Sequence, residues 1–149
     1  DRLRSRGLGD VYKRQELWSG ANDTLREKIG EDYPRDTFRH EQDLLVTENG
    51  KTALFAGCAH CGIVNILKSA EDVLGRAPDA VFAGFHLYNP SLGKSEPDEL
   101  VDAVGEKLRG DKVAHYFTGH CTGKEAYERL KRKLGDRLGE MPAGSDFAV

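Results

Sequence analysis

The sequence contains no apolar run that approaches the ~20 residues a membrane-spanning helix needs. Hydrophobic residues make up 38% of the chain and charged residues 32%, so we expect no membrane association. The chain has only three cysteines, an odd number without the spacing of a secreted disulfide scaffold, and no signal peptide precedes them. The expected location is therefore the reducing environment of the cytoplasm.

Acidic residues outnumber basic ones outside the first fifteen positions. Residues 1–15 hold five Arg and Lys residues against two Asp residues, so the chain's net charge of −3 leaves −6 on the remainder. A body with this balance lacks the basic surface that nucleic-acid binding requires. The 149 residues are the size of one domain, and they show no fixed-period repeat or low-complexity tract. The sequence does not indicate an oligomeric state.

The first fifteen residues are dense in Arg and Gly and show no period that would bury one face. They resemble translated adapter or vector sequence, so we predict that residues 1–15 are non-native and that a truncated native chain resumes near Glu16. A disordered basic tail is the alternative. Residues 16–37 are polar, and Asn22 can cap one or two helical turns, so we interpret this segment as a connector.

The rest of the chain alternates short apolar runs with amphipathic stretches. Asn49 and Gly50 separate two such runs and predict a β-hairpin over residues 43–56. Apolar runs at 80–85 and 112–118 predict two further strands, and a short terminal strand is expected near Phe147. Helical spacing predicts helices over 63–75, 95–109 and 124–134. This order predicts an α/β fold with a mixed sheet, built from a hairpin and three strand–helix units.

Each predicted strand–helix unit carries a histidine in the turn where its strand ends. The residues in these turns are Cys58, His60 and Cys61, then His86, then His120 and Cys121. In open α/β sheets, chemistry sits at such strand ends. Imidazole and thiolate are suited to zinc or iron, so we predict His60 and His120 as metal ligands and Cys58 as a candidate thiolate ligand. Cys121 is a second candidate, although cysteine also serves as a small buried apolar residue.

His86 can bind a metal, but we favour a catalytic role in which it hydrogen-bonds or protonates a substrate oxygen as a general acid. The two remaining histidines, His40 and His115, lie in polar sequence and inside a strand, and we interpret both as structural. Glu41 and Gln42 can orient a ligand through hydrogen bonds, or they form a solvated pair.

The sequence around His120 offers a further candidate binding feature. Thr118, Thr122 and the adjacent glycines precede a predicted helix, where backbone N–H groups suit an anionic substrate such as a phosphate ester. A simple helix cap by Thr122 accounts for the same residues. The expected partner is therefore a small molecule, with a phosphorylated one favoured by the first interpretation.

Four sequence blocks resemble the metallo-β-lactamase-fold hydrolases. They are FRHEQ at 38–42, GCAHCGIVNI at 57–66, AGFHL at 83–87 and YFTGHCTG at 116–123. More narrowly, they resemble the branch that includes the dihydropterin ribofuranosyl-aminobenzene phosphate synthase of methanopterin biosynthesis. The resemblance spans residues 38–134 and implies that residues 38–149 are the C-terminal half of a four-layer α/β/β/α sandwich.

The resemblance also implies a metal-dependent reaction. One or two divalent ions, with zinc favoured over iron or manganese, would activate water for attack on an ester or phosphoester. On this interpretation His60 and His120 are ligands, Cys58 takes the place of a metal-binding Asp or Cys, and His86 lines the pocket. The family's first-half signature, His-x-His-x-Asp-His, does not occur in the 149 residues, so we expect the fragment alone to be inactive.

Two other functions fit part of the pattern. Cys58 and Cys61 have the C-x-x-C spacing of thioredoxin-like redox proteins, after a strand and before a helix. That reading leaves the histidines of the other two turns unexplained. A non-enzymatic module that binds a small molecule is the second alternative, and it predicts ligand binding without turnover.

Overall fold

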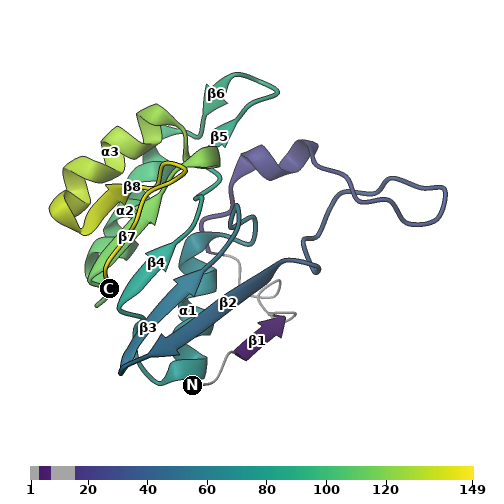
Figure 1. The fold of residues 1–149 in the computed structure, drawn as a ribbon. Coiled ribbons are helices and arrows are strands. Elements are labelled where there is room, and N and C mark those ends of the chain that lie inside the picture. The colour runs from purple at the N-terminus through teal and green to yellow at the C-terminus, as the bar shows by residue number, and fades with distance from the viewer. Residues whose placement is uncertain (1–3, 8–15) are drawn as a thin grey trace.

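The structure is a computed structural model that describes residues 16–149 in full and the backbone of residues 4–7; residues 1–3 and 8–15 are not described. Its main feature is a mixed sheet of six strands (Figure 1). In spatial order the strands are β1 (Arg4–Gly7), β2 (Gln42–Glu48), β3 (Lys51–Phe55), β4 (Ala80–Phe82), β7 (His115–Thr118) and β8 (Leu138–Glu140). The β1–β2 and β2–β3 pairs are antiparallel, whereas the β3–β4, β4–β7 and β7–β8 pairs are parallel. The predicted α/β class with a mixed sheet is confirmed.

The β2–β3 hairpin follows directly from its two-residue turn. Asn49 has a φ of 50° and Gly50 a φ of 78°, the positive values that a tight hairpin turn needs at both central positions. Glu48 pairs with Lys51 beside the turn, and Leu44 pairs with Phe55 at the other end. The predicted hairpin is therefore confirmed.

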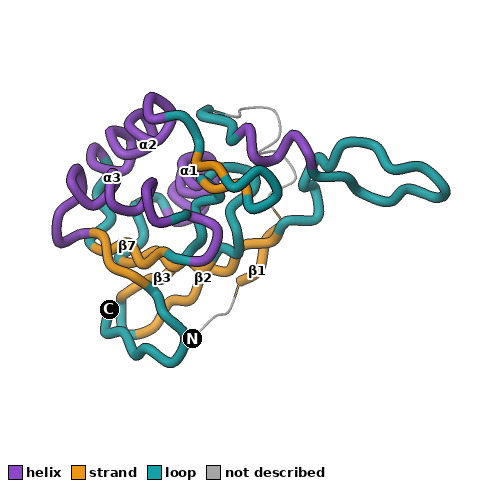
Figure 2. Tube along the Cα trace, turned by 90° about the horizontal axis from the view of Figure 1, so that it is seen from above, coloured by secondary structure: helices purple, strands orange, loops and turns teal. Residues whose placement is uncertain are grey.

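Three helices cover one face of the sheet (Figure 2). They are α1 (Ile63–Leu74), α2 (Asp98–Gly110) and α3 (Lys124–Leu134), and they confirm the three predicted helices. Helix α2 begins later than expected because Lys94–Ser95 (β6) pairs with Tyr88–Asn89 (β5) in a small separate sheet. Among the described residues, no helix is long and apolar enough to cross a membrane.

The core lies between the sheet and these helices. Most of its largest fully buried apolar side chains come from strands and helices: Leu54, Ile66, Val81, Val101, Leu108, Tyr116, Leu130 and Leu138. The apolar stripe of each helix faces the sheet, as the helical spacing in the sequence predicts. This packing fixes the carboxyl ends of β3, β4 and β7 relative to one another.

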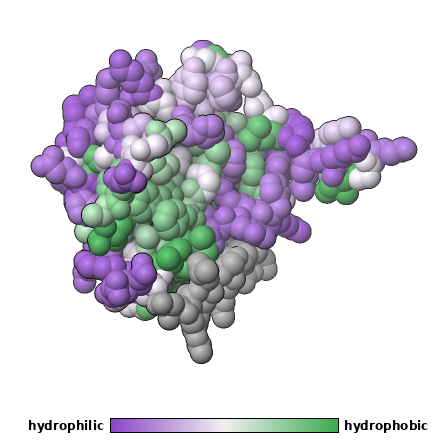
Figure 3. All heavy atoms as spheres, in the orientation of Figure 1, coloured by the Kyte–Doolittle hydropathy of each residue, from purple (hydrophilic) through white to green (hydrophobic). Residues whose placement is uncertain are grey.

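The opposite face of the sheet is apolar but carries no helix among the described residues. Phe55, Phe82 and Phe117 occupy paired positions on β3, β4 and β7. Their rings stack with centroids 4.9 Å apart at each step. This row contributes to the hydrophobic surface that Figure 3 shows over the sheet, where Phe55 is 40% exposed.

The terminal strand predicted near Phe147 is wrong. Residues 141–149 form no strand, and the last strand is β8, which pairs parallel with β7. Leu138 begins β8 and is fully buried, so a single apolar residue anchors this short strand. Phe147 instead packs its ring on Phe117 at 4.4 Å between centroids, on the open face of the sheet.

The segment between residues 16 and 37 contains one short helix and one long excursion, and its role as a connector stays a prediction. A 3-10 helix, η2 (Gly20–Thr24), is capped by Ser19 and not by Asn22 as expected. After η2 the chain makes an extended excursion held by bridges between Arg26 and Arg35 and between Ile29 and Asp32 (Figure 1).

The prediction for residues 1–15 mostly concerns residues that the structure does not describe. Residues 4–7 form β1, whose backbone pairs with β2 at the edge of the sheet. The remaining positions of this segment lie outside the described residues. That the segment is non-native stays a prediction.

Candidate functional site

Three histidine-bearing turns meet at one edge of the sheet. Strands β3, β4 and β7 are parallel neighbours, so their carboxyl ends, which lead to His60, His86 and His120, lie side by side. The ring centroids of His60 and His86 are 4.2 Å apart. Burial, followed by the charges of His60 and His120, lowers the pKa of His86 to about 4. The structure therefore brings the three predicted histidines together, whereas their roles stay predictions.

The imidazole of His86 is buried and has no polar partner in the part of the chain that the structure describes. The residue is 7% exposed, and neither Nδ1 nor Nε2 has a hydrogen-bond partner among the described residues. Buried polar groups in folded proteins are nearly always hydrogen-bonded, so such an exception points to an absent ion, water or ligand. Because its pKa is lowered, His86 is neutral at pH 7, which favours a hydrogen-bonding or ligating role over proton donation by an imidazolium.

Several residues in and around these turns have strained backbone conformations with positive φ values. Six non-glycine residues in the described part of the chain have positive φ values. Four of them belong to the site: Phe38, Ala59, His86 and His120. Such conformations are costly for residues with a Cβ, and they tend to accumulate at functional sites.

Glu41 holds the turn that carries His60. Its two carboxylate oxygens accept hydrogen bonds from the backbone N–H groups of His60 and Cys61, each at 2.7 Å. The sequence allowed Glu41 and Gln42 either to orient a ligand through hydrogen bonds or to form a solvated pair. The structure shows Glu41 bound to the backbone of the turn, whereas Gln42 is exposed at the start of β2.

The His60 ring is also held from two sides. Phe38 stacks on it with centroids 4.5 Å apart and an interplanar angle of 3°. Asn22, fully buried in η2, lies with Oδ1 3.0 Å from His60 Nδ1. Burial lowers the pKa of His60, against the opposing effect of the Glu41 charge. Sequence reasoning missed Asn22, because only its role as a helix cap was considered.

The cysteines divide into two environments. Cys121 Sγ donates to the carbonyl oxygen of Cys58 at 3.6 Å, although 63 residues separate them. An added Cβ at Gly84, between them, would lie 2.6 Å from Cys121 Sγ, so this close approach requires glycine. Burial and the Cys58 thiol raise the pKa of Cys121 to about 12. Cys58 and Cys121 therefore both lie at the site.

Cys61 has a different hydrogen-bond partner. Its Sγ donates to the carbonyl oxygen of Phe38 at 3.7 Å. Burial, followed by the hydrogen bond and charge of Glu41, raises the pKa of Cys61 well above its usual range. A reactive C-x-x-C couple depends on a thiol with a lowered pKa, so this environment counts against the redox alternative.

Thr122 does not cap helix α3. The residue before α3 is Gly123, and the helix has no side-chain cap, so the capping interpretation is wrong. The Thr122 hydroxyl instead accepts a hydrogen bond from the Phe85 N–H at 2.9 Å. Beside these residues, a pocket of about 280 Å³ is lined by His120 and by Lys124 and Tyr127 of α3.

The two histidines interpreted as structural differ in their distance from the site: His40 contacts Phe38, with ring centroids 6.2 Å apart, whereas His115 contacts the aromatic row on the open face of the sheet. His40 is exposed and lies 3.8 Å from an Asp36 carboxylate oxygen. His115 is exposed and stacks on Phe117 at 6.1 Å between centroids.

The side chains at the site are of the types that bind a metal ion, but too few of the described ones lie close enough together to hold one. Imidazole and thiolate are the usual zinc ligands, and the orphaned His86 ring lies among them. However, within the described ranges no three His, Cys, Asp or Glu side chains already form a group that could hold a metal ion. The described residues therefore fit as part of a ligand set.

Comparison with a solved structure identifies the class of fold. The chain superposes over 99% of its length, with a TM-score of 0.74, on 53% of Tm1679, a metal-dependent hydrolase of the β-lactamase superfamily. The sequence identity is 21%, so this likeness concerns the fold. The chain thus has the fold of part of a β-lactamase-superfamily hydrolase.

Comparison with known sequences identifies a more specific relative. Over 101 residues, which are 67% of this chain, it is 30% identical to the 7,8-dihydropterin-6-methyl-4-(β-D-ribofuranosyl)-aminobenzene-5'-phosphate synthase of Methanocaldococcus jannaschii. The chain spans 32% of the length of that protein. No protein-family model matches the chain. The resemblance inferred from the four sequence blocks is therefore confirmed, with partial coverage of both relatives.

Proposed function

We propose that the chain is part of a metal-dependent hydrolase and forms the second half of its four-layer sandwich. One observation carries the proposal: both nitrogens of the buried His86 ring lack a hydrogen-bond partner among the described residues, and the ring lies beside His60 and His120. The similarity to a metal-dependent hydrolase of the same fold supports it. Zinc suits the imidazole and thiolate groups best, with iron or manganese as alternatives.

The residues at the three turns have separate roles in this proposal. His60, His120 and Cys58 hold one or two divalent ions, together with ligands from outside the described residues. When bound, such an ion supplies the Lewis acidity that activates water for attack on an ester or phosphoester. His86, neutral at pH 7, ligates the ion or hydrogen-bonds a substrate oxygen.

The pocket beside His120 is the proposed binding place for the substrate. Lys124 contributes a cation to its wall, and Tyr127 contributes an aromatic ring. The amino end of α3 meets the same wall at Gly123, where the helix dipole favours an anion. A small ester or phosphoester is therefore the proposed class of substrate.

Titration of the full chain with Co²⁺ tests the proposal, because Co²⁺ absorbance reports imidazole and thiolate ligation. We expect binding that weakens at least about tenfold in His60→Ala and His120→Ala, because each variant removes one ligand. His115→Ala, an exposed histidine of the same sheet, is the matched control and should bind as the parent does. The chain alone should not hydrolyse an activated phosphoester at a measurable rate.

Three results would overturn the proposal. Equal Co²⁺ affinity in the parent and both histidine variants would remove the basis for a metal centre. A reversible Cys58–Cys61 disulfide with a potential near thioredoxin's ~ −270 mV, without metal binding, would instead support the redox alternative. Saturable binding of a phosphoester that is indifferent to His60→Ala would support a non-enzymatic binding module.

A further inference from the structure

Asn22 contacts His60 through both atoms of its side-chain amide, from 38 positions earlier in the chain. Asn22 Nδ2 donates to the backbone carbonyl of His60 at 2.8 Å. Asn22 Oδ1 lies 3.0 Å from Nδ1 of the His60 ring. The side chain of Asn22 is fully buried, so water does not compete for either contact.

These two contacts determine which nitrogen of His60 carries the proton. A carbonyl oxygen only accepts hydrogen bonds, so the Asn22 atom that contacts the His60 carbonyl must be the amide nitrogen. The other amide atom is then the oxygen, which also only accepts. Nδ1 of neutral His60 must therefore donate, which places the ring proton on Nδ1 and the free lone pair on Nε2.

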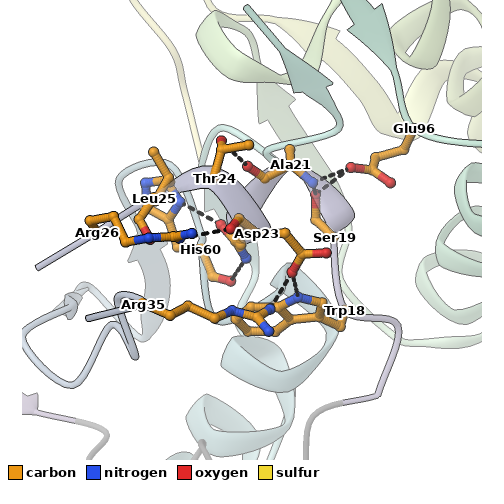
Figure 4. Close-up of polar contacts among 11 residues, drawn as sticks. Trp18, Ser19, Ala21, Asp23, Thr24, Leu25, Arg26, Arg35, His60 and Glu96 are labelled. Carbon is orange, nitrogen blue, oxygen red and sulfur yellow. Dashed lines mark hydrogen bonds and ion pairs between the residues drawn. The ribbon is translucent and has the colours of Figure 1, made fainter. Parts of the chain in front are cut away.

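The surrounding contacts hold Asn22 and the His60 ring in this arrangement. Helix η2, which contains Asn22, is tied to Glu96: Ser19 Oγ donates to Glu96 Oε1 at 2.9 Å, and the Ala21 N–H donates to it at 2.5 Å (Figure 4). Phe38 stacks on the His60 ring and limits its rotation. In this arrangement the centroid of the His60 ring lies 4.2 Å from the centroid of the His86 ring.

We propose that Asn22 is a positioning residue that fixes His60 as the Nδ1–H tautomer and so presents Nε2 to the site. The consequence for metal binding rests on the proposed function, because it is the Nε2 lone pair that would bind an ion. Neutral histidine in water prefers the opposite tautomer, with the proton on Nε2. Without Asn22 the ring would therefore offer the wrong nitrogen for most of the time.

Nitrogen-15 NMR of the histidine rings in the metal-free full chain tests the tautomer directly. At pH 8 we expect His60, assigned from the signals lost in His60→Gln, to be in the Nδ1–H form. In Asn22→Ala, His60 should shift to mainly Nε2–H. Asn22→Asp keeps an acceptor for Nδ1–H and should retain the parent tautomer. A parent chain with His60 in the Nε2–H form would overturn the inference, even if no variant folds.

Asn65 provides the matched control. It is buried like Asn22, and its Nδ2 donates to the carbonyl of Cys61, the next residue in the same turn, at 2.8 Å. Asn65→Ala therefore removes a comparable buried amide that does not hold the ring. We expect lower stability but an unchanged His60 tautomer. If Asn65→Ala and Asn22→Ala shift the tautomer equally, Asn22 has only a structural role.

Competition with a chromophoric chelator for Zn²⁺ then separates this inference from the proposed function. Loss of a residue that orients a metal-binding histidine typically weakens metal affinity about 10- to 100-fold. We expect that loss in Asn22→Ala but not in Asn65→Ala. If His60 has the expected tautomer but the parent binds no Zn²⁺, the metal proposal fails while the role of Asn22 stands. If Zn²⁺ binds equally to the parent and Asn22→Ala, the role of Asn22 fails while the metal proposal stands.

Discussion

Thr122 Oγ1 accepts a hydrogen bond from the backbone N–H of Phe85 at 2.9 Å, which joins the turn after β7 to the turn after β4. The same hydroxyl lies 2.6 Å from Thr118 Oγ1, and both threonines are buried. Phe85 immediately precedes His86, and Thr122 follows His120 by two positions. One hydroxyl group therefore holds two histidine-bearing turns in place.

The first prediction concerns this hydroxyl. Thr122→Val keeps the shape of the side chain but leaves the Phe85 N–H and the Thr118 hydroxyl without their partner. A buried polar group without a partner costs about 1–3 kcal/mol, so we expect the free energy of unfolding to fall by that amount in urea titrations. Thr24→Val is the control, since Thr24 is exposed and its hydroxyl donates only a long hydrogen bond, of 3.5 Å, to the Ala21 carbonyl. Equal losses in the two variants would show that the Thr122 bond has no special role.

The second prediction concerns Glu41. In Glu41→Gln, one oxygen that accepts from the turn becomes an NH₂ group, which faces a backbone N–H. Hydrogen bonds to charged groups contribute about 1.5–3 kcal/mol, and we expect a loss of stability in this range. The amides of His60 and Cys61 should also exchange with deuterium faster than in the parent. Glu48→Gln, at the exposed end of β2, should change neither quantity. Unchanged exchange in Glu41→Gln would contradict the prediction.

The strands and helices, and the placement of the three histidine-bearing turns at one edge of the sheet, could be predicted from the sequence. Each of these features depends on residues that are close together in the chain. Asn49 and Gly50 specify a turn by their tolerance of positive φ, and each helix shows its apolar stripe in a single window. The placement of His60, His86 and His120 then follows from one rule, that the carboxyl ends of parallel strands share an edge. No contact between distant residues was needed for these predictions.

The supporting contacts could not be predicted because their partners lie far apart in the sequence. Asn22 and Glu41 lie in polar stretches, which the sequence indicates to be a connector and a solvated loop. Both nevertheless form hydrogen bonds with the turn that carries His60. Thr122 has the ordinary position of a helix cap, but its hydroxyl instead accepts a hydrogen bond from the N–H of Phe85, 37 residues away. Such choices between a local and a distant partner are decided by tertiary packing, which composition and spacing do not encode.

The third prediction concerns the aromatic row on the open face of the sheet. Phe55, 40% exposed, stacks on Phe82, and exposed apolar surfaces of this kind promote association. We expect the chain to bind a hydrophobic dye and to self-associate with rising concentration in sedimentation experiments. Phe55→Ser should reduce both effects, whereas Tyr33→Ser should not, because Tyr33 lies on the excursion away from the sheet. A parent chain that stays monomeric and binds no dye would contradict this expectation.

The last prediction is the pH dependence of stability that Asp43 imposes. Asp43 is 7% exposed, and its Oδ1 has no hydrogen-bond partner among the described residues. Burial, and then the charge of Glu41, raises the pKa of Asp43 to about 7 in the folded chain. The unfolded chain has an ordinary pKa of about 3.9, so the folded state binds this proton more tightly. Protonation of Asp43 therefore stabilises the folded state. This stabilisation is complete below about pH 4 and is lost as the pH rises to about 7.

Asp43→Asn tests this directly, because the amide resembles the protonated carboxyl group and cannot ionise. At pH 8 we expect the variant to be more stable than the parent by roughly 2–4 kcal/mol, from about 1.4 kcal/mol for each unit of pKa shift. At pH 4 the two should agree, because the parent carboxyl is protonated when folded. Asp146→Asn, at an exposed position, should match the parent at both values. If Asp43→Asn is less stable than the parent at pH 8, the carboxylate is paired in the folded chain, and the sign of the effect is reversed.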